Sequence, residues 1–161
     1  MTRQEQMVQQ LDRDVERTLA MYDQDSGRLM QPSLTTDTRY TAAALSLLLT
    51  AYAHPGSRFF SHPEVLGCAN GAIRYLETAR RTSGCFDLSS CNFDSAPDTA
   101  FAVNALIDVC DLLMVSGVPR RDELLGSLEG IIEKACEGIC QGGFHTPNHR
   151  WAISAALKHA S

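Results

Sequence analysis

The segment PDTAFAVNALIDVCDLLM, residues 97–114, decides the fold class of this chain. Its apolar residues recur at the three- and four-residue spacings of an α-helix, and few positions on any side are polar. A helix that is apolar nearly all round is buried on all sides. Two other segments are of the same kind, residues 38–53 and the segment that opens at Pro147, so the sequence predicts three inner helices.

Three further segments alternate with these and are amphipathic. They cover about residues 3–24, 63–82 and 119–140, and each carries one apolar stripe with charged residues elsewhere. One face of such a helix lies in water, so we expect three outer helices that cover the inner ones. The chain shows neither the period-two alternation of a strand nor an Asn-Gly hairpin signal. We therefore expect an all-α fold without strands.

Capping residues and prolines predict where several helices begin. Ser61-x-x-Glu64 and Ser95-x-x-Asp98 have the pattern of capping boxes. The prolines that suit a first helical position are Pro63, Pro97, Pro119 and Pro147.

The three inner helices open on one repeated pattern, an Asp or Asn followed three residues later by an aromatic residue and then by small apolar residues. The copies are DTRYTAAA (37–44), DTAFAVNA (98–105) and NHRWAISA (148–155), and each follows a loop that begins with Gly27, Gly84 or Gly143. Repeats of this kind stack side by side. We expect residues 1–161 to be a single all-α domain of three outer–inner helical hairpins that form part of an α/α toroid. Three hairpins make only an arc, so we also expect the chain to be the first part of a larger protein.

Composition and charge exclude several classes of protein. Fourteen Lys and Arg against nineteen Asp and Glu give a net charge of −5, which argues against a basic nucleic-acid-binding face. No apolar run approaches the ~18–20 residues of a membrane span, and the polar start is unlike a secretory signal. We expect a cytoplasmic protein with no nucleic-acid or membrane partner. The six cysteines lack zinc spacing, and a reducing cytosol disfavours disulfides, so we expect buried thiols and no metal.

The inner helices would begin at one face, and polar residues collect there. The candidate site residues are Arg39, Tyr40, Asn92, Asp98, His145, Asn148, His149 and Trp151. The densest group is GGFHTPNHRW, residues 142–151, where the first turn of a helix can attract a carboxylate. Asn148 would donate a hydrogen bond to that carboxylate, His149 would accept a proton, and Trp151 would stack on a sugar ring. The alternative is structural: Asn148 would only satisfy the helix end, and His149 and Trp151 would pack in the core.

The run GGFHTPNHRWAISAAL resembles the α/α-toroid polysaccharide lyases of the heparinase II/III-like group, and NFDSAPDTAFAV is similar to the repeat before it in such proteins. The resemblance covers about residues 38–161. It implies β-elimination of uronate-containing poly- or oligosaccharides without a cofactor. It also implies that Asn148 neutralises the uronate carboxylate and that His149 is a base or a partner in that neutralisation. The family's tyrosine acid or base and its following sheet domain have no counterpart here, so we expect no turnover by this chain alone.

Two other functions remain open at this point. An unsaturated-glycoside hydrolase on a similar toroid would use carboxylates, with Asp37 and Asp98 as candidates. A non-enzymatic helical-repeat module would bind a partner through the same face. The lyase requires Asn148 and His149, the hydrolase requires Asp98, and the module requires neither for any chemistry. An arc with exposed inner helices would also be able to associate with itself.

Overall fold

The computed structural model describes residues 2–29, 38–88, 92–142 and 146–160. Over these residues the chain is mostly helical, which confirms the all-α class. The elements are α1 (Arg3–Leu19), α2 (Thr38–Ala53), α3 (Pro63–Ala79), β1 (Phe86–Leu88), β2 (Asn92–Ser95), α4 (Ala96–Val115), α5 (Arg121–Ile139) and α6 (Pro147–His159). None of these helices has the length and apolar character to cross a membrane.

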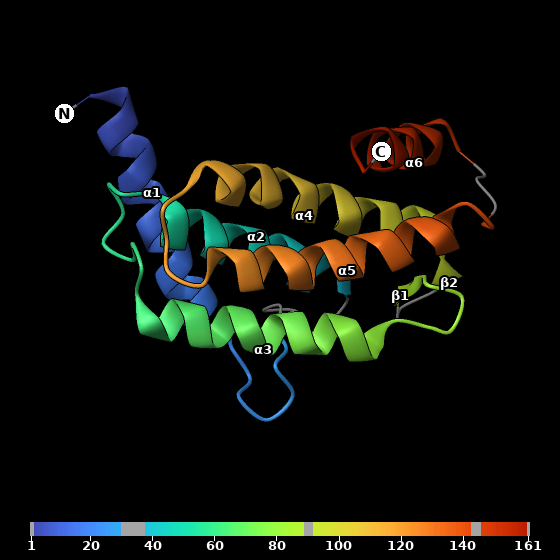
Figure 1. The fold of residues 1–161 in the computed structure, drawn as a ribbon, viewed down its shortest axis with the longest axis horizontal. Helices are drawn as coiled ribbons and strands as arrows, with labels where there is room; N and C mark the ends of the chain where they lie inside the picture. The colour runs from blue at the N-terminus through green and yellow to red at the C-terminus, as the bar shows by residue number, and fades with distance from the viewer. Residues whose placement is uncertain (1, 30–37, 89–91, 143–145, 161) are drawn as a thin grey trace.

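The helices form an inner layer of α2, α4 and α6 and an outer layer that includes α3 and α5 (Figure 1). The central helix α4 packs against α2, α5 and α6. Figure 1 shows that α2, α4 and α6 each begin at the end of the molecule where β1 and β2 lie, whereas α3 and α5 run in the opposite direction. Among the outer helices, α2 packs most extensively on α3 and α4 on α5, so each inner helix forms an antiparallel pair with the outer helix that follows it. This pairing is inner–outer, and it differs from the outer–inner grouping expected from the sequence.

The expectation of a fold without strands is wrong. Strands β1 and β2 form an antiparallel hairpin in which Phe86 pairs with Ser95 and Leu88 with Asn92. The hairpin has no period-two pattern because only Phe86 and Ser95 are buried in it. It is held by the helices instead: the Phe86 N–H donates to Thr99 Oγ1 at 2.7 Å, and Thr38 Oγ1 donates to the Asp87 carbonyl at 3.4 Å.

Several helix ends differ from those expected. Helix α1 ends at Leu19 rather than near residue 24, because Asp23 accepts hydrogen bonds from the Asp25 N–H and from Ser26 Oγ. Side-chain bonds of this kind stabilise a turn in competition with helix. The beginning of α1 is fixed by a capping box between Thr2 and Glu5 that sequence inspection missed.

Of the two predicted capping boxes, one is wrong and the other is confirmed only as a cap by Ser95. Helix α3 does begin at Pro63, but Ser61 has a left-handed φ of 54° and His62 occupies the N-cap position without a side-chain bond. Ser95 does cap α4, since its Oγ accepts a hydrogen bond from the Asp98 N–H.

Helix α5 begins at Arg121 rather than Pro119. The residue between them, Arg120, takes a left-handed φ of 59° at the N-cap position, and this conformation separates Pro119 from the helix.

Two glycine pairs bring the loops before α2 and α4 against the following outer helices. Gly27 (φ 73°) lies against Gly71 of α3, and Gly84 (φ 100°) lies against Gly138 of α5. A Cβ atom on Gly27 would lie 2.4 Å from the Gly71 carbonyl oxygen, and one on Gly84 would lie 2.2 Å from the Lys134 carbonyl oxygen. Glycine is required because the backbone conformation is left-handed and the approach leaves no space for a side chain. The repeated glycine loops therefore serve the same packing function in two of the three repeats.

Burial follows the inner–outer distinction for α2 and α4 but not for α6. Helix α4 buries twelve of its residues, among them Leu106 and Leu113 with no exposed surface. Helix α6 buries only Ala152, Ile153 and Ala156. The expectation that the last inner helix is enclosed on all sides is therefore wrong within the described residues.

Candidate functional site

The polar residues at the start of α4 form a connected group with Arg39 of α2. Arg39 Nη1 lies 3.4 Å from Asp98 Oδ1, and its guanidinium lies 5.6 Å from the centre of the Phe101 ring. The Asp98 side chain is largely buried, whereas the Arg39 side chain is 45% exposed. The group thus presents a cation, partly neutralised by Asp98, at the end of the molecule that carries β1 and β2.

Asp98 and Asn92 both take part in capping α4. Ser95 Oγ donates to Asp98 Oδ2 at 2.6 Å and accepts from Asn92 Nδ2 at 2.8 Å. Asp98 lies in the first turn of α4, where the positive end of the helix dipole stabilises a carboxylate. Both carboxylate oxygens of Asp98 are therefore engaged, one by Arg39 and the other by Ser95.

Tyr40 is adjacent to Arg39 in sequence but does not join this group. Its hydroxyl lies 4.0 Å from Met21 Sδ, and its ring packs against the core. Neighbouring residues of a helix point about 100° apart, since there are 3.6 residues per turn. Tyr40 accordingly faces the connection that follows α1, while Arg39 faces α4.

Asn148, His149 and Trp151 lie in the first turns of α6, as the Thr146-Pro147 sequence predicts. The Thr146 hydroxyl donates to Asn148 Oδ1 at 2.5 Å and makes no hydrogen bond to the backbone of α6. No described residue accepts a hydrogen bond from the Asn148 amide nitrogen. The backbone N–H groups of Asn148 and His149 have no hydrogen-bond acceptor among the described residues.

His149 and Trp151 differ in exposure. The Nδ1 atom of His149 is buried without a hydrogen-bond partner in the described part of the chain. Trp151 is 78% exposed, so it is not a core residue of this chain. The core-packing alternative for Trp151 therefore does not hold here, and its ring offers a flat apolar surface to a ligand.

The two groups are connected through the α4–α6 contact. Asn104 Nδ2 donates to the Ala152 carbonyl at 2.9 Å. Asp98 lies six residues before Asn104, about 9 Å along α4, and Asn148 lies four residues before Ala152, about 6 Å along α6. Since both helices begin at the same end of the molecule, the two groups lie at that end, although no hydrogen bond or ion pair among the described residues joins them.

Two expected site residues, Asp37 and His145, lie outside the described residues. Within the described residues, no group of three or more His, Cys, Asp or Glu side chains is arranged to hold a metal ion.

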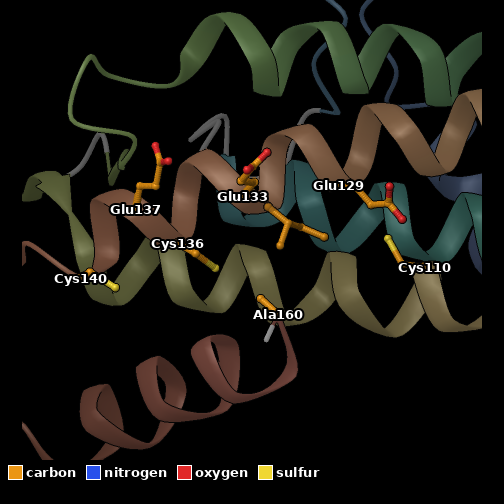
Figure 2. Close-up of a pocket in the computed structure, with 8 residues that line it drawn as sticks. Cys110, Glu129, Glu133, Cys136, Glu137, Cys140 and Ala160 are labelled. Carbon is orange, nitrogen blue, oxygen red and sulfur yellow. The ribbon is translucent and has the colours of Figure 1, made fainter.

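A further cavity lies elsewhere, along α5 (Figure 2). It has a volume of about 560 Å³ and is lined by Cys110, Glu129, Ile132, Glu133, Cys136, Glu137, Cys140 and Ala160. Burial raises the pKa of the Cys110 thiol to about 12, and burial followed by the neighbouring Cys140 raises the pKa of Cys136. These two thiols are therefore uncharged near neutral pH, and the glutamates supply the charge of the cavity.

Sequence inspection missed two contributors to these sites. Phe101 covers Arg39, and Asn104 connects α4 to α6. Asn104 did have a signal, because it is an isolated amide in an otherwise apolar helix. The pairing of Arg39 with Asp98 had none, since the two are fifty-nine residues apart in the chain.

Comparison of the sequence with protein-family models finds no match, and comparison with curated proteins finds none either. The function is therefore argued from the motif and the geometry described above.

Proposed function

We propose that this chain is an α/α-toroid domain of the uronate-polysaccharide lyase type and that the start of α6 binds the uronate carboxylate. The observation that carries the proposal is that Thr146, at the N-cap position of α6, makes no side-chain bond to the helix backbone. Thr146 bonds to the Asn148 side chain instead, and no described residue accepts a hydrogen bond from the backbone N–H of Asn148 or His149. A helix start with free N–H groups favours an anion, and the Asn148 amide adds a donor.

This arrangement suits β-elimination. Removal of the proton next to the uronate carboxylate places negative charge on the carboxylate oxygens as an enolate forms. Preorganised donors stabilise such charge most when they are fixed before the reaction. Asn148 and the α6 backbone would serve as these donors, and His149 would accept the proton or assist in the neutralisation. The glycosidic oxygen must then receive a proton from an acid, a role that the resemblance assigns to a tyrosine.

Further residues suit the binding of an acidic saccharide. The exposed ring of Trp151 lies one turn from Asn148 and would stack on a sugar ring. Arg39, held over Phe101 at the same end of the molecule, would attract a second acidic group. The expected contacts of Asn92 and Asp98 with substrate receive less support, because both side chains already cap α4. Tyr40 is directed towards Met21.

The proposal is tested by binding, because Trp151 is the single tryptophan of the sequence and reports on the start of α6. Fluorescence would be titrated with size-matched oligosaccharides of heparan, chondroitin, hyaluronan and alginate, and with an uncharged oligosaccharide. We expect an acidic saccharide to bind and Asn148→Ala to weaken it about tenfold, the loss of a charged hydrogen bond of about 1.4 kcal/mol. The matched control is His159→Ala, at the opposite end of α6. Equal binding of uncharged and acidic saccharides would contradict the proposal.

Elimination itself would be measured on a polypeptide that contains this chain together with the toroid and sheet segments that the resemblance implies. The product carries a conjugated double bond that absorbs in the ultraviolet. Formation of this product that is lost in His149→Ala supports the lyase. Saccharide binding without any product in that longer polypeptide would favour the non-enzymatic binding module.

The hydrolase receives less support from the geometry. Its described candidate, Asp98, has both oxygens engaged by Arg39 and Ser95 and is not directed at a vacant site. Loss of glycoside hydrolysis in Asp98→Asn, with saccharide binding and stability retained, would reverse this preference.

A further inference from the structure

The cavity along α5 is an open groove between α5 and the C-terminal end of α6, with α4 as its floor (Figure 2). We call it the α5–α6 groove. A line of apolar and thiol side chains runs along it at four-residue spacing, from Ile132 through Cys136 to Cys140. Their exposure increases along that line: Ile132 is 7% exposed, Cys136 is half-buried and Cys140 is exposed. The apolar face of α5 therefore extends from the buried Ile132 to the exposed Cys140, and this edge is an apolar stripe that the rest of the described chain covers only in part.

An acidic row borders this stripe. Glu129, Glu133 and Glu137 follow one another at four-residue spacing, and all three are exposed. None of them forms an ion pair within the described residues. Like charges at this spacing destabilise a helix, and carboxylates in the last turns also face the negative end of the helix dipole. Helix α5 has no basic residue in its last turn to offset this repulsion.

The packing pattern of the chain indicates what belongs in the groove. Inner helix α2 is covered by the outer helix that follows it, α3, and inner helix α4 is covered by α5 in the same way. Inner helix α6 has no such cover among the described residues, and its contact with α5 is slight. The outer helices that cover α2 and α4 lie side by side, because α5 lies beside α3. An outer helix that covered α6 would by the same pattern lie beside α5. That position coincides with the α5–α6 groove.

We propose that the α5–α6 groove binds an amphipathic helix of a partner, with an apolar stripe seated on Ile132, Cys136 and Cys140 and with Lys or Arg residues facing the acidic row. The apolar stripe of the partner would complete the burial of the stripe on α5. Its basic residues would relieve the repulsion among Glu129, Glu133 and Glu137. The proposal is independent of saccharide binding, because Ala160, which lines the groove, follows the end of α6 opposite to Asn148.

The surface of α1 distinguishes this partner from a second copy of the chain. In a second copy of the chain, the outer helix that could enter the groove is α1. Its apolar stripe already packs on α2 through Val15. The remaining surface of α1 is polar apart from Met7. An α1 helix thus lacks a second apolar stripe to match the one on α5.

The test uses synthetic helical peptides and the rate of alkylation of Cys140, mapped by mass spectrometry on the intact chain. The first peptide has leucines at helical spacing flanked by lysines, the second has glutamates in place of the lysines, and the third is residues 3–19 of this chain. We expect the basic peptide to slow alkylation of Cys140 at least tenfold and the other two to have little effect. We expect Glu133→Lys to lower the affinity for the basic peptide at least fivefold and to raise the affinity for the acidic peptide.

The matched control is Glu77→Lys, an exposed glutamate on outer helix α3 outside the groove. It should change the affinity for the basic peptide less than twofold. Equal protection by the basic and acidic peptides, or no protection by the basic peptide, would overturn the proposal. Protection by residues 3–19, together with dimers at increasing protein concentration, would overturn it in favour of a second copy. A circular dichroism spectrum unchanged by Glu133→Lys ensures that a loss of binding is not a loss of fold.

Discussion

Replacement of Asp98 by alanine should destabilise the chain by about 3 kcal/mol. The side chain makes a 2.6 Å hydrogen bond from Ser95 Oγ, and a bond to a charged group contributes about 1.5–3 kcal/mol. The Arg39 pair adds less than about 1 kcal/mol, because the Arg39 side chain is 45% exposed and solvent screens it. A carboxylate at a helix start adds about 0.3–1 kcal/mol.

Asp98→Asn separates these contributions. The asparagine retains an oxygen that can accept from Ser95 but loses the charge, so we expect a loss of about 1 kcal/mol. Ser95→Ala should cost about 3 kcal/mol, because it removes the bond to the Asp98 carboxylate together with the cap on the Asp98 N–H. Because Ser95 and Asp98 share one bond between their side chains, the double variant should be less destabilised than the sum of the single variants by about 1–2 kcal/mol.

The assay is urea and thermal unfolding followed by far-ultraviolet circular dichroism. At about 2–4 °C per kcal/mol for a chain of this size, Asp98→Ala should lower Tm by about 6–12 °C. An unfolding free energy within about 0.5 kcal/mol of the wild type would refute the argument that Asp98 holds the start of α4. Additive effects of Ser95→Ala and Asp98→Ala would refute their direct coupling.

Three further predictions follow from single positions. Gly84→Ala should unfold at markedly lower temperature, since φ is 100° and the new Cβ would lie 2.2 Å from the Lys134 carbonyl oxygen; a Tm equal to that of Gly117→Ala, an open position, would contradict this. The hydrogen bond from Arg81 lowers the pKa of Asp87 in the folded state. The stabilisation from this bond is present above the unfolded pKa of about 4 and is lost as the pH falls below that value. Asp87→Asn should therefore make the free energy of unfolding depend less on pH in the acid range. Burial raises the pKa of Cys110 to about 12, so near neutral pH an alkylating reagent should modify exposed Cys140 long before Cys110; comparable rates would show that the α4–α5 contact opens readily.

The helices were predictable where their signals are local. Helix α2 has the expected bounds of Thr38–Ala53, and α3 and α6 begin at the expected prolines. The end of α1 and the β1–β2 hairpin could not be predicted in this way, because each depends on specific hydrogen bonds rather than on periodicity. Asp23 closes the turn after α1, and Thr99 of α4 accepts the Phe86 N–H.

In the candidate site, too, the features set by neighbouring residues were predictable and those set by packing between helices were not. The position of Asn148 and His149 in a first turn follows from the adjacent Thr146-Pro147 sequence. The contact of Arg39 with Asp98 could not be predicted, because it depends on how α2 packs beside α4. The same packing directs the hydroxyl of Tyr40 to Met21.

The sequence by itself determined the all-α class, the alternation of inner and outer helices and the repeated glycine loops, because helix periodicity and backbone freedom are properties of neighbouring residues. Only the tertiary structure decided which helices pair, that α6 is covered on one side only, and that a groove with an acidic border lies along α5. These features depend on which surfaces meet across the chain. The free energy of such contacts comes from apolar area that is buried between distant segments, and no local pattern records it.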